Sequence, residues 1–166
     1  MSNPPDQPTD ARARLLSHFE TAKGTTEQGQ KWDDLWKEGF LPWDKGFPNP
    51  ALVDLLTERQ DLFPPLESRR KALVPGCGKG YDVLLLSAFG YDAYGLEISS
   101  NALEAARKNE EEMSGKGVYE TRDGVEKGSV TWLTGDFFAD GFLKDVQGEG
   151  SFDLIYDYTV SVPVLD

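Results

Sequence analysis

The segment "LVPGCGKGYD", residues 73–82, constrains the fold of this chain more than any other. Three glycines stand at alternate positions, Gly76, Gly78 and Gly80, directly after a short apolar run. Glycine adopts positive φ angles without strain and lets a ligand approach the backbone closely. A strand, a glycine-rich turn and a helix in that order are typical of nucleotide-binding proteins, so we expect a ligand to lie against this main chain.

The sequence around this turn alternates between two kinds of apolar pattern. Short apolar runs predict four strands, "KALVP", "YDAYGLEI", "SVTWLTGD" and "FDLIYDYTV". Longer segments between them predict helices, "GYDVLLLSAFG" and, after a serine cap, "SSNALEAARKNEEEM". Strands that alternate with helices predict right-handed crossovers and a parallel sheet, which is the α/β class.

The sequence before the first strand predicts a helical N-terminal region. Residues 1–10 hold three prolines and predict a disordered lead, followed by a helix that ends at Gly24. A second helix would place Trp32, Leu35 and Trp36 on one face, and this spacing alone favours packing in a core. After a proline-broken connector, a third helix is expected from about Pro50 to Leu62, with Asn49 as its N-cap.

Composition excludes several classes of function. The chain carries 17 Lys and Arg against 29 Asp and Glu, a net charge of −12, so neither nucleic acid nor a membrane surface is an expected partner. With one cysteine and one histidine, neither an internal disulfide nor a structural metal site is expected. The absence of an apolar leader or a long apolar run predicts a cytoplasmic protein.

Acidic and aromatic residues follow the predicted strands at the edge where a ligand is expected. Glu97, 21 residues after Gly76, ends the second strand, where a carboxylate can accept hydrogen bonds from ribose hydroxyls. Asp136 and Phe137 follow the third strand and suit an adenine amino group and ring, and Tyr158 lies at the end of the fourth. Because the carboxyl ends of parallel strands meet at one edge, these residues together predict a cofactor site.

Three ligand classes compete for the glycine-rich turn. A phosphate-binding P-loop is excluded because Lys79 is followed by Gly80 rather than Ser or Thr. A dinucleotide is disfavoured, though still open, because Tyr81 occupies the position of the last glycine in that motif. S-adenosyl-L-methionine, which has no pyrophosphate, fits best. Cys77 lies between the glycines with no histidine nearby in sequence, so we expect it to pack as a small buried side chain.

Several segments together resemble the thiopurine S-methyltransferase family, and most closely its plant and fungal thiol and halide methyltransferases. They are "WDDLWKEGFLPWDKGFPNPALVDLL", "ALVPGCGKGYDV", "GLEIS", "GDFF" and "FDLIYDYT". The resemblance implies a Rossmann-like class I methyltransferase sheet, of which this chain would hold the first four strands in the order 3-2-1-4 after its N-terminal helices. It also implies S-adenosyl-L-methionine as the cofactor.

By that resemblance, Trp32, Trp36 and Trp43 belong to an aromatic segment that covers the cofactor. Gly76 and Gly78 would lie beside its methionine part. Glu97 would hold the ribose, Asp136 and Phe137 the adenine, and Tyr158 would lie near the sulfonium as the candidate catalytic residue. For Asp33, Asp34 and Asp44, help with the acceptor's proton and surface or capping roles both stay open.

The resemblance also implies the reaction and a division of the chain. A soft nucleophile of a small molecule, a thiolate or a halide, would take the methyl group in an in-line displacement. Three parts are expected: residues 1–24 as a lead and N-terminal helix, 25–65 as the cofactor-covering segment, and 66–166 as the cofactor-binding core.

The last residues, "VSVPVLD", do not resemble the family's continuation, which adds three further strands. We therefore expect a C-terminally truncated chain whose fourth strand has an open edge and can self-associate. The alternative to an active enzyme is thus a catalytically inactive fragment that acts, if at all, through cofactor binding or protein association.

Overall fold

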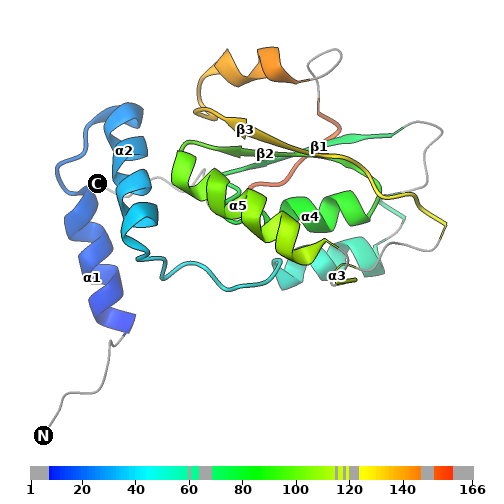
Figure 1. Ribbon diagram of the computed structural model, residues 1–166, viewed down its shortest axis with the longest axis horizontal. Helices are drawn as coiled ribbons and strands as arrows, with labels where there is room; N and C mark the ends of the chain where they lie inside the picture. The colour runs from blue at the N-terminus through cyan, green and yellow to red at the C-terminus, as the bar shows by residue number, and fades with distance from the viewer. Residues whose placement is uncertain are drawn as a thin grey trace, which may run out of the picture.

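A parallel four-stranded sheet forms the centre of the computed structural model, which describes residues 8–59, 61–63, 69–114, 116–117, 119, 124–146 and 152–158. The strands lie in the order β3-β2-β1-β4 (Figure 1), as the family resemblance implies. Their bounds are Lys71–Pro75 for β1, Asp92–Glu97 for β2, Val130–Thr134 for β3 and Leu154–Ile155 for β4. All pairs are parallel, so the four carboxyl ends meet at one edge.

Helices cover both faces of the sheet. The α-helices α3 (Pro50–Glu58), α4 (Tyr81–Ala88) and α5 (Ser100–Met113) lie on one face, and the short 3-10 helix η1 (Asp140–Asp145) lies on the other (Figure 1). Strand β1 supplies both apolar layers, because Ala72 and Val74 pack under α3 and α4 while Leu73 packs towards η1. Burial on both faces explains why this strand is an uninterrupted apolar run.

Two further helices, α1 (Pro8–Phe19) and α2 (Gly24–Glu38), stand beside the carboxyl ends of the strands (Figure 1). The ring of Phe19 packs on that of Trp32 with centroids 4.6 Å apart. His18 lies in the contact between the two helices, with its Nε2 atom 2.8 Å from the carbonyl oxygen of Lys31. The helix pair is therefore held by packing as well as by surface charges.

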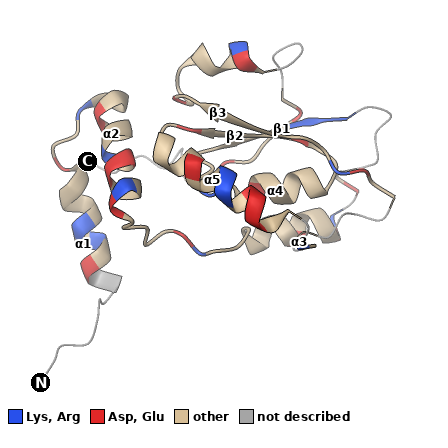
Figure 2. Cartoon of the chain, viewed as in Figure 1, with Lys and Arg blue, Asp and Glu red and all other residues tan. Residues whose placement is uncertain are grey.

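Local sequence signals set two of the helix starts. Asn49 caps α3, since its Oδ1 atom accepts a hydrogen bond from the Ala51 N–H at 3.0 Å, and Pro50 follows at the first helical position. Ser99 caps α5 in the same way. Charged residues of both signs line the outer face of α5 (Figure 2), and Glu111 and Glu112 are exposed there.

Three boundary predictions are wrong. Helix α1 begins at Pro8, inside the expected lead, because proline suits a first helical turn, and it ends at Phe19 rather than Gly24. Helix α3 ends at Glu58, before Leu62, whose N–H instead donates to the Arg59 carbonyl in a turn. Strand β4 is two residues long, and β1 is the one strand that it pairs with among the described residues. Residues 1–7 and 159–166 lie outside the described residues.

Within the described residues, no helix is both long and apolar enough to cross a membrane. The same part of the chain contains no group of three or more histidine, cysteine or acidic residues arranged to hold a metal ion.

Candidate functional site: a cavity at the carboxyl ends of the strands

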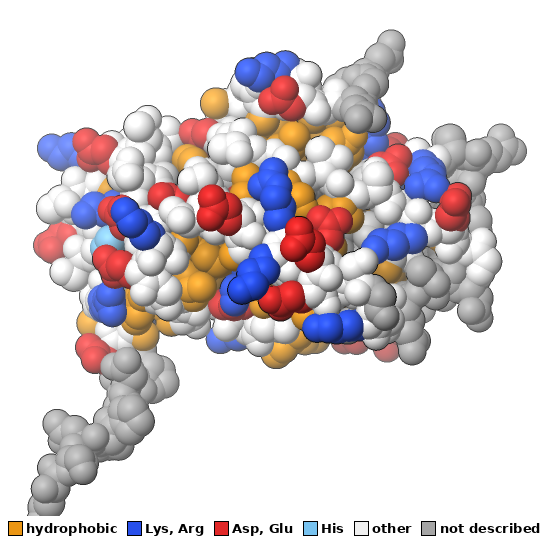
Figure 3. All heavy atoms as spheres, viewed as in Figure 1, with side chains coloured by type: hydrophobic (Ala, Val, Ile, Leu, Met, Phe, Trp, Pro, Cys, Tyr) orange, Lys and Arg blue, Asp and Glu red, His pale blue; other side chains and the backbone are white. Residues whose placement is uncertain are grey.

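A cavity of about 890 Å³ opens where the carboxyl ends of the strands face α2 and the connector that follows it. Its size lies in the range of small-molecule sites, roughly 300–1,000 Å³. Hydrophobic side chains reach the surface between the two N-terminal helices and the rest of the chain (Figure 3). Every residue that the sequence predicts for the cofactor lines this one cavity: Trp32, Trp36, Trp43, Gly76, Gly78, Glu97, Asp136, Phe137 and Tyr158.

The glycine-rich turn forms the floor of the cavity. Gly76, Gly78 and Gly80 all adopt positive φ angles, of 59°, 53° and 74°. A Cβ atom on Gly78 would lie 3.4 Å from the ring of Trp36, and one on Gly80 would clash with the ring of Trp132. Backbone conformation therefore favours glycine at all three positions, and at Gly80 the indole ring of Trp132 also excludes a side chain.

Glu97 lies buried at the end of β2, with 7% of its surface exposed. Its carboxylate accepts three backbone hydrogen bonds, from the N–H groups of Gly78 at 3.1 Å, Ile98 at 2.9 Å and Ser99 at 3.2 Å. Burial raises the pKa of Glu97 and outweighs these hydrogen bonds, which lower it. Because two carboxylate oxygens offer about four acceptor positions, the group retains capacity for one further donor from the cavity.

Three tryptophans form an aromatic wall opposite the glycine-rich turn. Trp32 and Trp36 come from α2, and the ring of Trp43 lies edge-on to both, with centroid distances of 5.2 and 6.2 Å. Gly39 ends α2 in the left-handed conformation, with φ 72°, and turns the chain so that Trp43 returns to the helix. The rings are partly exposed and line the cavity, so the core packing that spacing alone favours is incomplete.

Asp33 fixes α2 against the start of α5. Its carboxylate accepts hydrogen bonds from the Ser99 hydroxyl at 2.6 Å and from the Asn101 side-chain amide at 2.9 Å. Burial would raise the pKa of Asp33, but these hydrogen bonds prevail and lower it. Of the two roles left open for Asp33, the capping role describes what its side chain does here.

A second contact joins the connector after α2 to the glycine-rich turn. The Lys79 ammonium lies 2.6 Å from the Asp44 carboxylate, whose second partner is the Gly46 N–H at 3.0 Å. Burial opposes ionisation of Asp44, but the contacts with Lys79 and Gly46 prevail, and the pKa of Asp44 is lowered. The pKa of Lys79 is correspondingly raised, mainly through its hydrogen bond to Asp44.

The ends of β3 and β4 supply the remaining predicted residues. The Asp136 carboxylate accepts a hydrogen bond from the Phe138 N–H at 2.9 Å, and the ring of Phe137 packs beside that of Phe138. Tyr158, after β4, is 69% exposed and stands at the rim of the cavity. The thiol of Cys77 packs against Gly95, and burial together with the charge of Glu97 raises its pKa, so it is not poised as a nucleophile.

Sequence reasoning missed a further acid in the cavity wall, Asp82. This residue lies in the first turn of α4, and its Oδ1 atom accepts a hydrogen bond from the Asn49 N–H at 2.7 Å. Burial raises the pKa of Asp82, and the hydrogen bond from Asn49 acts in the other direction. Its position in the sequence, two residues after the last glycine of the turn, could have identified it, because a residue in the first turn of the following helix lies on the side of the ligand.

The profile of the thiopurine S-methyltransferase family matches residues 27–164, which include every residue of the predicted site. Probable thiol methyltransferase 2 of Arabidopsis thaliana is 32% identical over 128 residues, covering 77% of this chain and 46% of that protein. Thiocyanate methyltransferase 1 of Brassica oleracea is 35% identical over 136 residues, covering 82% and 50%. The chain thus spans about half the length of the curated relatives it matches.

Solved structures share the fold. A structure from work on the conversion of a disulfide bond into a thioacetal group in echinomycin biosynthesis has a TM-score of 0.56 at 24% identity, covering 80% of this chain and 47% of the other. A methyltransferase of Anabaena variabilis has a TM-score of 0.52 at 21% identity, covering 82% and 49%. These likenesses confirm the predicted fold class, and the family match adds the lineage. The chain belongs to the thiopurine S-methyltransferase family.

Proposed function

We propose that this chain binds S-adenosyl-L-methionine in the cavity at the carboxyl ends of its strands and forms the cofactor-binding part of a methyltransferase. The observation that carries this proposal is the meeting of nine predicted residues, from four strand ends, the helix α2 and the connector after it, on the wall of a single cavity. Membership of a methyltransferase family supports it.

The groups along the cavity match the parts of the cofactor in order. Asp136 and Phe137, after β3, offer an acceptor and an apolar ring for adenine. Glu97, after β2, has the spare acceptor capacity that a ribose hydroxyl requires. The glycine-rich turn after β1 presents Gly76 and Gly78 to the cavity without side chains, which supports an approach of the methionine part to the backbone there.

When bound, the cofactor would supply an activated methyl group, and the residues of this chain would orient and enclose it. The tryptophan rings opposite the turn can attract a sulfonium through cation–π contacts and exclude water. We assign this covering role to residues 25–65 and cofactor binding to the core, residues 66–166. Tyr158, at the open rim, is the candidate for positioning the methyl acceptor.

We further propose that the acceptor is a small-molecule thiol or a halide. The curated relatives include thiol and thiocyanate methyltransferases, which supports a small, soft nucleophile. Such a nucleophile reacts faster when it loses water in an apolar enclosure, and the aromatic wall provides one.

The test is transfer of a labelled methyl group from S-adenosyl-L-methionine to a panel of small thiols, thiocyanate and iodide. The expected result is labelled product with the wild-type chain. At subsaturating cofactor, Glu97→Ala should lower the rate of product formation by about tenfold or more, the loss expected for a charge-assisted hydrogen bond. Cofactor binding without transfer to any acceptor would favour the inactive-fragment alternative. A folded chain that neither binds nor transfers would contradict the proposal.

A further inference from the structure

Asp82 lines the cavity, but the proposed cofactor site as described above gives its carboxylate no ligand to bind. Among the described residues, its only hydrogen bond comes from the Asn49 N–H to Oδ1. Every fully buried side-chain polar atom in that part of the chain has a partner, so the second oxygen, Oδ2, keeps some exposed surface, and Asp82 is a lining residue of the cavity. The carboxylate therefore has a free acceptor position where a ligand would lie.

Two other acids of the cavity wall, Asp44 and Glu97, have most of their acceptor positions occupied by protein groups. Asp44 is paired with the Lys79 ammonium at 2.6 Å. Glu97 accepts three backbone hydrogen bonds. Lys45 also lines the cavity, but its side chain is exposed to solvent. The negative charge of Asp82 is thus left without a cationic partner among the described residues.

The charge of Asp82 affects the pKa values of two phenols, those of Tyr156 and Tyr119. Burial, together with the charge of Asp82, raises the pKa of Tyr156 to about 12. Burial and the charges of Tyr81 and Asp82 raise that of Tyr119 to about 12 as well. These phenols stay neutral at physiological pH and supply no positive charge. A cationic group of a ligand would find its natural partner in this carboxylate.

The sheet order places Asp82 at a defined end of the ligand. The strand ends run from Asp136 after β3 through Glu97 after β2 and the glycine-rich turn after β1 to Tyr158 after β4. A nucleoside with adenine at Asp136 and ribose at Glu97 would extend its amino-acid part towards the turn and α4, where Asp82 lies. We propose that Asp82 binds the primary ammonium of that amino-acid part. This inference rests on the proposed function.

Calorimetric titrations separate the ammonium from the two alternatives, the sulfonium and a purely structural role. S-adenosylhomocysteine keeps the ammonium and has no sulfonium, and 5′-methylthioadenosine has neither. We expect Asp82→Asn to weaken binding of S-adenosylhomocysteine about tenfold or more, the scale of a hydrogen bond to a charged group, and to leave 5′-methylthioadenosine unchanged. Asp54→Asn, an exposed change on α3 outside the cavity, is the matched control and should alter neither affinity.

Three results would overturn the inference. Equal weakening of both ligands would make Asp82 a structural anchor for Asn49. Unchanged S-adenosylhomocysteine binding would remove any role in ammonium binding, and weakening of S-adenosyl-L-methionine alone would assign Asp82 to the sulfonium. If Asp82→Asn does not fold, Asp82→Ser is used in its place, because serine keeps a short acceptor for the Asn49 N–H.

A measurement on the wild-type chain needs no variant. An analogue of S-adenosylhomocysteine that lacks only the amino group should bind about tenfold more weakly or worse, and equal binding would contradict the inference. If the wild-type chain binds S-adenosylhomocysteine in none of these titrations, the proposed function itself fails. That outcome is distinct from a failure of the ammonium assignment, in which the parent ligand still binds.

Discussion

Gly39 and Gly80 share nearly the same backbone conformation, with φ of 72° and 74°, yet their surroundings differ. A Cβ atom on Gly39 would meet nothing within 4 Å, whereas one on Gly80 would clash with the Trp132 ring. We expect Gly39→Ala to cost about 1 kcal/mol of folding free energy from the conformation alone, and Gly80→Ala about 2 kcal/mol or more beyond that. Urea unfolding measures both, and equal losses would contradict a steric role for Trp132.

The buried carboxylate of Glu97 predicts a pH dependence with a definite sign. Its pKa is raised on folding, so its ionisation is harder in the folded chain than in the unfolded one. Relative to Glu97→Gln, the wild-type chain is most stable below pH 4.5, and this advantage falls as the pH rises through the raised pKa and then levels off. Unfolding free energies of both proteins, measured from pH 4 to 8, check this, and a constant difference would contradict it.

Sequence reasoning about single residues succeeds where one local rule decides the outcome. Glu97 and the glycines follow from their places after strands, and Asn49 and Ser99 follow from capping chemistry. The roles of Asp33 and Asp44 could not be separated from the sequence. Their partners lie on other elements, 66 residues away for Ser99, and only the fold brings them together.

At the scale of elements, the docking of α2 depends on Asp33. We expect Asp33→Ala to loosen α2 from α5, because the Ser99 hydroxyl and the Asn101 amide lose their acceptor. Faster hydrogen exchange of α2 amides and a change in tryptophan fluorescence report this directly. Asp34→Ala is the control, since Asp34 makes no hydrogen bond or ion pair recorded among the described residues. An equal effect of the two substitutions would refute the role of Asp33.

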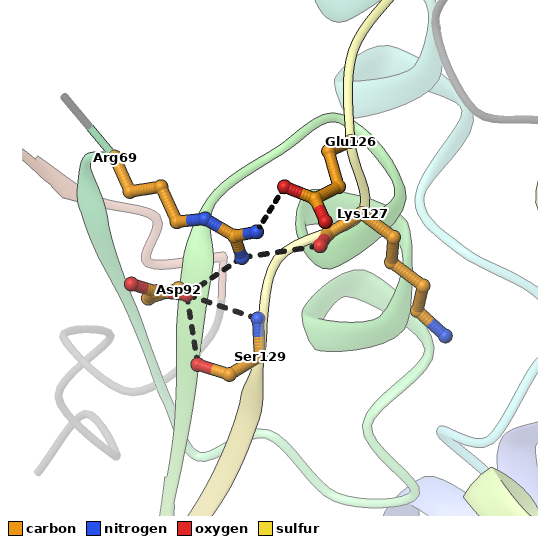
Figure 4. Close-up of polar contacts among 5 residues, drawn as sticks. All are labelled: Arg69, Asp92, Glu126, Lys127 and Ser129. Carbon is orange, nitrogen blue, oxygen red and sulfur yellow. Dashed lines mark hydrogen bonds and ion pairs between the residues drawn. The ribbon is translucent and has the colours of Figure 1, made fainter. Parts of the chain in front are cut away.

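The opposite end of the sheet is held by a polar cluster around Arg69 and Asp92 (Figure 4). Arg69 lies 2.7 Å from Glu126 and donates to the Lys127 carbonyl, while Asp92 accepts hydrogen bonds from the N–H and hydroxyl of Ser129. These contacts fix the segment that enters β3. Burial opposes ionisation of Asp92, but the hydrogen bonds from Ser129 prevail, and the net effect is a lowered pKa.

Because the pKa of Asp92 is lowered on folding, its stabilising contribution is present above pH 3.8 and lost as the pH falls through the folded-state pKa. We expect Asp92→Asn to destabilise the chain by about 1 kcal/mol at pH 7. The difference from wild type should shrink below pH 3.8. Thermal melting of both proteins over this range tests the prediction, and a difference that grows in acid would refute it.

Element types were predictable and element ends were not. Alternating strand and helix patterns led to the parallel sheet, because parallel strands need helical crossovers. The correct order of its strands came from the family resemblance. The length of β4 depends on what pairs with it, and among the described residues only β1 does, over two residues. The β-propensity of a segment does not indicate which other strands pair with it.

In the molecule as a whole, acids, glycines and aromatic residues from separate elements converge on the carboxyl edge of a parallel sheet. Sequence reasoning anticipated the edge, because ligands in open α/β sheets bind there. It did not anticipate the anchors that hold the aromatic segment over that edge, the Asp44–Lys79 ion pair and the Asp33 hydrogen bonds. Asp82 escaped notice because its burial and missing cation are properties of the folded chain.

The most direct test of the central claim is a calorimetric titration of the 166-residue chain with S-adenosylhomocysteine. The account predicts saturable binding at one site per chain, weakened by Glu97→Ala by about 1–3 kcal/mol. The absence of binding by a chain that circular dichroism and a cooperative melt show to be folded would contradict the assignment of this cavity to the cofactor.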